Sequence, residues 1–237
     1  MFRPTPNDIS FTFFGFPSAI QPFFWLMAVI LSTYSLGGIN NDMPIWFAKL
    51  FLGIAAILIS ILIHELGHAL VFRYVFNTHC GIVLHGFGGV TIPLQHFPRR
   101  HGFSGMCANC FLSFAGPLAG FILGFLMFLL LLALPNDGRL APLLLLHFLE
   151  WMKWIAVVWG FLNLLPVYPM DGGNIFREIF LFFFPRRGVE YSLMLSILFA
   201  MFLAVAALQY GMFIITVLFA YLAYQNYQEM TAGSFHR

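Results

Sequence analysis

The sequence predicts an α-helical multi-pass membrane protein, with about six transmembrane helices and a small β-sheet or hairpin at the cytoplasmic face. Composition is the first indication: hydrophobic residues make up 61% of the 237 residues, charged residues only 8%, and the mean hydropathy is +0.89. A soluble domain carries roughly 25% charged residues, because its surface must face water. The bilayer is therefore the expected solvent for most of the chain, which we interpret as a single domain over residues 1–237.

Hydropathy along the chain is the second indication, because six apolar segments are separated by turn residues or charges. A helix needs about 20 apolar residues, each rising about 1.5 Å, to cross the hydrocarbon core. The expected spans cover approximately residues 21–36, 44–74, 110–134, 141–165, 189–208 and 211–227. Only Gln209 and Tyr210 separate the last two, which could also form one bent unit.

Two further stretches are expected to be extended. Residues 9–16 begin with alternating apolar and hydroxyl side chains, and residues 81–94 combine β-branched residues with four glycines and a proline. Such patterns are typical of strands and hairpins. Non-helical backbone at membrane depth must lie against protein or a water-filled cavity. We therefore expect a small sheet at one membrane face.

The positions of Lys and Arg predict the orientation. With both termini cytoplasmic, the outer side holds Lys49, Arg139 and Lys153. The inner side holds the other eight cations: Arg3, Arg73, Arg99, Arg100, Arg177, Arg186, Arg187 and Arg237. This excess follows the positive-inside rule. The net charge of +2 and the lack of a basic run argue against nucleic-acid binding.

The main chemical motif is His64-Glu65-Leu66-Gly67-His68, an HExxH within an apolar helix. Side chains four positions apart share one helix face, so both imidazoles can reach one metal ion. The glutamate beside that face can take a proton from an attacking water. A chance match is the alternative. However, one ionisable side chain costs about 2.5–3.5 kcal/mol at the centre of a membrane helix, which favours a metal site.

A catalytic zinc site usually has three protein ligands, so one ligand is missing from this motif. Asp171 is the preferred candidate, because it follows the fourth expected span on the membrane side where the second span ends. Pro166 and Pro169 are expected to unwind the helix there, and the glycines after Asp171 permit close backbone approach. The alternative is that Asp171 caps the next helix.

Together these motifs resemble the site-2 protease family of intramembrane zinc metalloproteases. The HExxH is followed, at the end of a later span, by the NxxPxxPxDGG that starts at Asn163. Further matches are Phe14-Gly15-Phe16-Pro17 leading to Gln21-Pro22-Phe23, Phe87-Gly88-Gly89-Val90, and Ala115-Gly116-Pro117. We expect neither an inserted PDZ-like nor an appended CBS-like domain, as in the minimal six-span members.

The resemblance implies a zinc metalloendopeptidase with one catalytic zinc ion (Zn2+). His64, His68 and Asp171 are the implied ligands, and Glu65 is the implied general base and acid. The implied function is hydrolysis of peptide bonds within or near transmembrane segments of membrane-protein substrates, as in regulated intramembrane proteolysis. The active site is then expected toward the cytoplasmic face.

Three residues are expected to bind the substrate. The resemblance implies that Asn163 contacts the substrate or the developing oxyanion, with helix packing as its alternative role. Gly88 and Gly89 belong to the glycine-rich hairpin. A helical substrate must unwind before attack, and the edge of this hairpin offers strand addition to replace the lost hydrogen bonds.

Other functions remain open. A CAAX-type prenyl protease is also a membrane HExxH enzyme, but it takes a glutamate as third ligand. A catalytically inactive metal-binding or scaffold protein of the same fold would not require Glu65. A transporter with an intramembrane metal site is a third possibility, but no inverted repeat of broken helices is visible.

The remaining motifs have ordinary interpretations. Cys107 and Cys110 form one CxxC without a second pair, so neither a redox nor a metal role is expected. Four histidines near the inner face are interpreted as polar loop residues rather than a second metal site: His79, His85, His96 and His101. Three glycines at four-residue spacing predict close helix packing: Gly116, Gly120 and Gly124.

Overall fold

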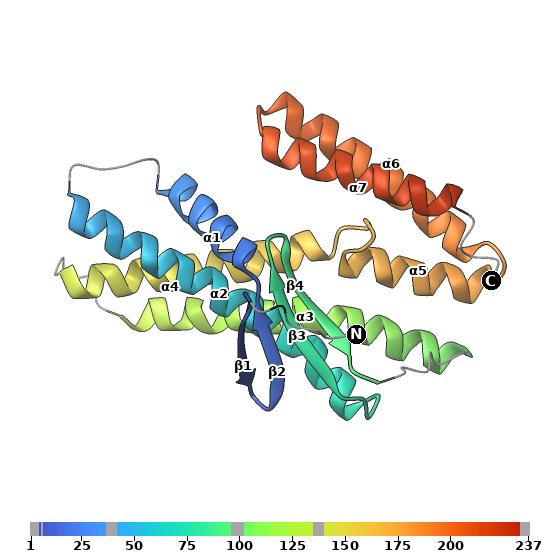
Figure 1. Ribbon diagram of the computed structural model, residues 1–237, viewed down its shortest axis with the longest axis horizontal. Coiled ribbons are helices and arrows are strands. Elements are labelled where there is room, and N and C mark those ends of the chain that lie inside the picture. Colours follow the sequence, from blue (N-terminus) through green and yellow to red (C-terminus); the bar gives the residue numbers. More distant parts are fainter. Residues whose placement is uncertain (1–4, 6, 37–41, 96–101, 135–139, 233–237) are drawn as a thin grey trace. The chain divides into compact units, whose positions relative to one another are not determined.

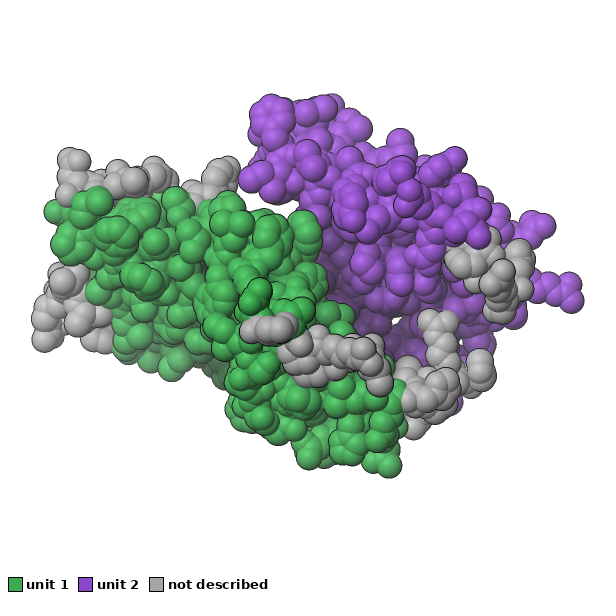
Figure 2. Space-filling model, in the orientation of Figure 1, with its two compact units in different colours: residues 1–97, 115–161 green, residues 98–114, 162–237 purple. Residues whose placement is uncertain are grey.

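A computed structural model describes residues 5, 7–36, 42–95, 102–134 and 140–232 (Figure 1). Their elements are, in order, β1 (Ile9–Phe13), β2 (Phe16–Ile20), α1 (Pro22–Ser35), α2 (Met43–Tyr74), β3 (Cys80–His85), β4 (Gly88–Pro93), α3 (Gly102–Ala133), α4 (Leu140–Asn163), α5 (Asp171–Phe183), α6 (Gly188–Gln209) and α7 (Phe213–Thr231). The chain divides into two compact units (Figure 2). Unit 1 comprises residues 1–97 and 115–161, and unit 2 comprises residues 98–114 and 162–237. The single-domain organisation stays a prediction.

Four of the described helices are long and apolar enough to cross a membrane: Met43–Tyr74, Gly102–Ala133, Leu143–Asn163 and Gly188–Gln209. They correspond to the second to fifth expected spans. The first expected span is α1, which has only 14 residues. The last is α7, with 19 residues, which is not among the four. The multi-pass helical class is confirmed, and the count of six is approximate.

Helix α3 begins at Gly102, earlier than the start near residue 110 expected from the sequence. The glycines and polar residues of its first turns do not end the helix, and one of these polar residues, Asn109, makes a tertiary contact. Within unit 2, the Asn109 amide donates a hydrogen bond of 2.9 Å to the Glu178 carboxylate of α5. A polar residue inside a helix is thus satisfied by a neighbouring helix.

The extended stretches form one four-stranded sheet in the order β1-β2-β3-β4. Residues 9–16 are themselves the start of a hairpin, which turns at Phe14 and Gly15, both with positive φ. β1 pairs antiparallel with β2, β2 parallel with β3, and β3 antiparallel with β4. The expectation of a small sheet built from both stretches is confirmed.

The sheet packs against α2 within unit 1. Both β3 and β4 contact this helix (Figure 1). Ile82 and Leu84 of β3 are completely buried, and their burial excludes water from this side of the sheet. The backbone N–H of Gln21 donates to the carbonyl of Leu84 at 2.9 Å, which ties the start of α1 to the same strand.

Small residues bring the helices of each unit close together. In unit 1, Gly120 and Gly124 of α3 face α4, where a Cβ at Gly120 would lie 3.0 Å from the carbonyl oxygen of Ala156. Close packing is therefore confirmed for these two glycines. In unit 2, α6 and α7 are separate helices joined by a turn at Gly211, which has a φ of +68°. A stripe of small buried residues on α6 packs in this unit: Ser192, Ser196, Ala200 and Ala204.

Candidate metal centre

Helix α2 brings the three residues of the HExxH motif together in unit 1. His64, Glu65 and His68 are 2%, 3% and 8% exposed, respectively. Each offers one ligand atom, and these atoms all lie within 4.8 Å of one another. Among the described residues this is the group of histidine, cysteine and acidic side chains with metal-site spacing.

The two histidines fit a shared zinc ion. Their Nε2 atoms lie 3.3 Å apart. Two nitrogens bound to one tetrahedral zinc at 2.0–2.1 Å are separated by about 3.3–3.4 Å. The observed separation therefore suits two imidazoles that ligate the same ion. A zinc ion also suits the donor set, since imidazole and carboxylate are its usual ligands at catalytic sites.

Gly116 of α3 leaves the space in front of these two nitrogens open. A Cβ built at Gly116 would collide with Nε2 of His68 and lie 2.7 Å from Nε2 of His64. Any side chain at this position would thus fill the space in which a shared ion must sit. Gly116, the glycine of the Ala-Gly-Pro sequence, therefore leaves room for a metal ion, in addition to the helix packing expected for it. The spacing of Gly116 with Gly120 and Gly124 concealed this role.

The carboxylate of Glu65 is held by strand β4. The Thr91 hydroxyl donates to Oε2 of Glu65 at 2.7 Å and lies 3.1 Å from the Glu65 carbonyl oxygen. A Cβ at Gly89 would lie 2.6 Å from Oε1 of the same carboxylate. Sequence reasoning missed Thr91, because a threonine in a strand carries no signal of a contact 26 residues away.

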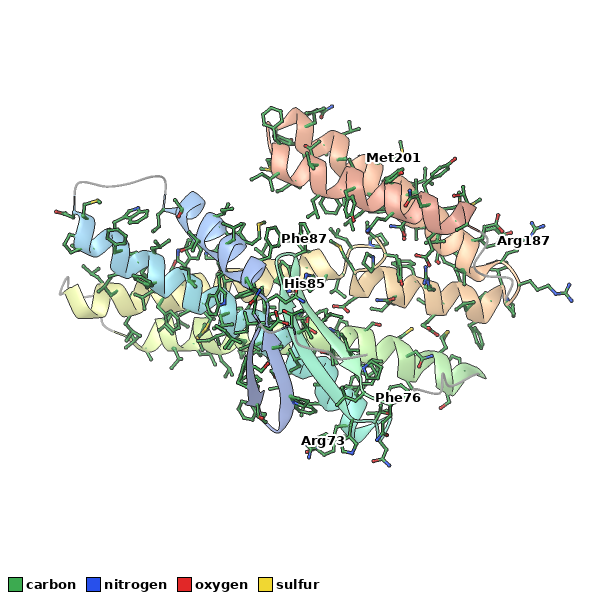
Figure 3. The ribbon with its side chains drawn as sticks, viewed as in Figure 1. Arg73, Phe76, His85, Phe87, Arg187 and Met201 are labelled. Carbon is green, nitrogen blue, oxygen red and sulfur yellow. The ribbon has the colours of Figure 1, made fainter. Side chains whose placement is uncertain are left out.

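The turn between β3 and β4 is compact, and Figure 3 labels His85 and Phe87 beside it. The backbone N–H of Phe87 donates to Nδ1 of His85 at 3.3 Å. Gly88 has a φ of +127°, and a Cβ there would collide with the Trp159 indole of α4. Burial lowers the pKa of the His85 imidazole below its ordinary value, while the negative charge of Glu65 opposes this. Gly88 thus allows the hairpin to approach α4.

In unit 2, Asp171 is the first residue of α5. The N-cap position is Met170, which has extended backbone, so Asp171 is not the cap that the sequence left open as its alternative role. A carboxylate in the first turn is favoured by the helix dipole. Gly172 and Gly173 follow, and a Cβ at either position would collide with the backbone of residues 164–168. The two glycines therefore let the segment before Asp171 fold back onto the start of α5.

Tyr168 anchors this segment to the helices of unit 2. Its backbone N–H donates to the Ser196 hydroxyl at 3.1 Å, and its carbonyl accepts from the Asn226 amide at 2.7 Å. The Arg177 guanidinium lies over its ring, 3.7 Å from the centroid. Arg177 also pairs with Glu229 at 3.0 Å. The backbone that precedes Asp171 is thus held by α5, α6 and α7 together.

The remaining residues singled out from the sequence lie as follows. Asn163 is the half-buried last residue of α4 and belongs to unit 2. His79 is exposed, and neither it nor His85 joins the His64 cluster. His96 and His101 lie outside the described residues. Cys107 is exposed and Cys110 is half-buried, with its sulfur 3.9 Å from the carbonyl oxygen of Ile175.

The chain is similar to known proteins in sequence. The model of peptidase family M50 matches residues 131–203. A zinc metalloprotease of Methanocaldococcus jannaschii is 30% identical over 169 residues, which cover 71% of this chain and 44% of that protein. Rip3 of Mycobacterium tuberculosis is 30% identical over 155 residues, 65% of this chain and 37% of that protein. The chain therefore spans less than half the length of the curated relatives it matches.

A solved structure shares the fold. The site-2 protease from Methanocaldococcus jannaschii has a TM-score of 0.61 to this chain at 21% sequence identity. The match covers 94% of this chain and 95% of that chain. The likeness of fold therefore extends over nearly the whole of both chains.

Proposed function

Because the chain is homologous to the zinc metalloproteases of peptidase family M50, we propose that it is an intramembrane zinc metalloprotease. It hydrolyses peptide bonds within or near transmembrane segments of other membrane proteins. The observation that carries this proposal is the 3.3 Å separation of the His64 and His68 Nε2 atoms, with the Glu65 carboxylate beside them. Three ionisable side chains buried this closely in an apolar helix need a shared purpose, and a metal ion supplies it.

His64, His68 and Asp171 are the proposed zinc ligands. The open space at Gly116 supports the first two, and the position of Asp171 at the start of α5, on backbone anchored through Tyr168, supports the third. When bound, zinc supplies Lewis-acid chemistry, since it lowers the pKa of water and polarises a peptide carbonyl.

The residues of the chain perform the proton transfers in this proposal. Glu65 takes a proton from the attacking water and passes it to the leaving amine, as a general base and then a general acid. The amide of Asn163 donates a hydrogen bond to the oxygen on which negative charge develops, and a fixed donor in a dry site is effective there. The Glu65 carboxylate is buried, which limits its access to competing water.

The substrate binds as an added strand on β4. The backbone N–H of Leu94 donates to the carbonyl of His79 at 2.8 Å, which fixes the alternation of the antiparallel ladder. By that alternation, the N–H and C=O groups of Gly89 and Thr91 point away from β3. Among the described residues no strand pairs with this outer edge of β4. An unwound substrate can therefore recover its backbone hydrogen bonds at these two residues.

The proposed orientation keeps both termini and the active site on the cytoplasmic side. It rests on the distribution of Lys and Arg among the expected loops.

A proline scan of a substrate tests the proposed strand addition to β4. Prolines at alternate substrate positions should block cleavage, because they remove the N–H groups that pair with β4. Equal tolerance at all positions would contradict the added strand.

Glu65→Gln tests the catalytic assignment. The variant should bind one zinc ion per chain yet fail to cut single-span membrane segments that the wild type cuts. Glu150→Gln is the matched control, since Glu150 is exposed and pairs with Lys153 at 3.6 Å. Equal cleavage by Glu65→Gln and wild type would refute the assignment, and a wild type that holds zinc without cleaving any segment would favour the inactive alternative.

Asp171→Asn tests the third ligand. Zinc content should fall in this variant, as measured by atomic absorption on the purified protein. Asp42→Asn, which changes an exposed aspartate just before α2, should retain zinc. Full zinc content in Asp171→Asn would instead support a glutamate ligand, as in prenyl proteases.

A further inference from the structure

In strand β4, the backbone groups and the side chains of the same residues face in different directions. Residues Gly89 and Thr91 direct their backbone N–H and C=O groups toward the open edge, in the plane of the sheet. Their side-chain positions point out of that plane, and both meet Glu65. The two residues proposed to pair with the substrate are therefore the same two that contact the proposed base.

The contact between Thr91 and Glu65 is specific. The hydroxyl has one proton to donate, and the two acceptors near it lie at 2.7 and 3.1 Å. The shorter distance, to Oε2, is that of an ordinary O–H···O hydrogen bond, so the proton is directed to Oε2. Gly89 leaves room for Oε1 on the other side, because a Cβ there would lie 2.6 Å from it.

We infer that Thr91 is a positioning residue for Glu65, which fixes the carboxylate rotamer by holding Oε2 and leaves Oε1 to accept the proton of the attacking water. The inference rests on the proposed function, because it gives Glu65 the role of base. A glutamate side chain rotates about three bonds and loses entropy when it is held. Thr91 removes that freedom before the substrate arrives, which is the preorganisation that proton transfer requires.

The same bond links substrate binding to the base. An added strand at Gly89 and Thr91 fixes the backbone of β4, and the Thr91 side chain is then fixed relative to the bound peptide. The distance between the scissile bond and the Glu65 carboxylate is thereby set through one strand. The Thr91 hydroxyl is therefore the group that connects the bound strand to this carboxylate.

Thr91→Val removes the hydroxyl at nearly constant shape. The expected result is a fall in kcat of about 10- to 100-fold with KM unchanged, because positioned general-base catalysis contributes about 100-fold or more. Zinc content should stay at the wild-type level. Thr91→Ser restores the hydroxyl and should recover most of the lost kcat, which a purely structural role of the methyl group would not explain.

Thr78→Val is the matched control. Thr78 is also in unit 1 and buried, and its hydroxyl donates to the carbonyl of Phe76 at 3.1 Å, away from Glu65. This variant should keep kcat. An unchanged kcat in Thr91→Val, or a loss of zinc from it, would overturn the inference, as would a Thr91→Ser variant no better than Thr91→Val.

A stability measurement separates this inference from the proposed function. In a double-mutant cycle of Thr91→Val and Glu65→Ala, the unfolding midpoints should be non-additive, because the two side chains form one interaction. Additive effects would overturn the bond whether or not the protein cleaves peptides. Failure of the proposed function has a different signature, namely a Glu65→Gln variant as active as the wild type, with the coupling between Thr91 and Glu65 intact.

Discussion

The guanidinium of Arg177 stacks on the ring of Tyr168, 3.7 Å from its centroid, and the same group pairs with Glu229 at 3.0 Å. Three segments of unit 2 meet in this contact: the segment before α5, α5 itself and α7. Tyr168 is also held through its backbone by Ser196 and Asn226. The segment that leads into Asp171 is therefore fixed by one aromatic residue.

Arg177→Gln should destabilise the protein by about 2–3 kcal/mol, because it removes a stacking contact and leaves the Glu229 carboxylate without its cation. Thermal or denaturant unfolding in detergent measures this change. Arg186→Gln, an exposed arginine in the loop after α5, should change stability by no more than about 0.5 kcal/mol. If both variants unfold alike, the Tyr168 contact contributes nothing.

Gly116→Ala should abolish zinc binding. Its new methyl group would occupy the space in front of the two imidazole nitrogens, so the ligands could not share an ion. Metal analysis of the purified protein checks this outcome. Gly120→Ala is the matched control one turn further along α3, where the nearest group is the Ala156 carbonyl at 3.0 Å, and it should retain zinc. A fully loaded Gly116→Ala would contradict the assigned space.

Gly89→Ala should separate metal binding from catalysis. The added methyl group displaces the Glu65 carboxylate but not the imidazoles, so zinc content should persist while kcat falls at least about 10-fold. Metal analysis and cleavage rates on one preparation give both values. Loss of zinc together with activity would indicate that the hairpin, rather than the carboxylate alone, had moved.

Cys80 should be unreactive in the folded protein. Burial raises the pKa of this thiol to about 11, despite the opposing effect of Arg73, and the side chain is 1% exposed. At pH 8 the thiolate fraction is then about one in a thousand, since the pH lies about three units below the pKa. A variant that retains Cys80 as its single cysteine should react with maleimide only once it is unfolded. A variant that retains the exposed Cys107 instead should react in the native state.

The sequence was sufficient for the features that depend on local spacing. His64, Glu65 and His68 are neighbours on one helix, so their cluster follows from helical periodicity. The hairpin of β3 and β4 followed from its glycines and β-branched residues. The apolar segments likewise indicated the helices, although α3 begins at Gly102, before its apolar segment, and the contact of Asn109 with Glu178 is one that no local pattern reveals.

Features that depend on tertiary contact could not be predicted. Thr91 contacts Glu65 across the interface between the sheet and α2, and no sequence motif around Thr91 indicates that contact. The same holds for the anchoring of Tyr168 by α6 and α7. Gly116 shows an intermediate case, because its spacing predicted close packing, but only the structure identified the imidazoles as what it approaches.

The alternation along β4 also limits how a bound peptide could move. Only Gly89 and Thr91 offer outward N–H groups on this strand, because Pro93, the next residue of that parity, has none. A peptide could therefore shift along the edge only by two residues, about 7 Å, while keeping its hydrogen bonds. Successive cuts in one substrate would then be spaced by even numbers of residues. The masses of the released fragments would show this two-residue spacing.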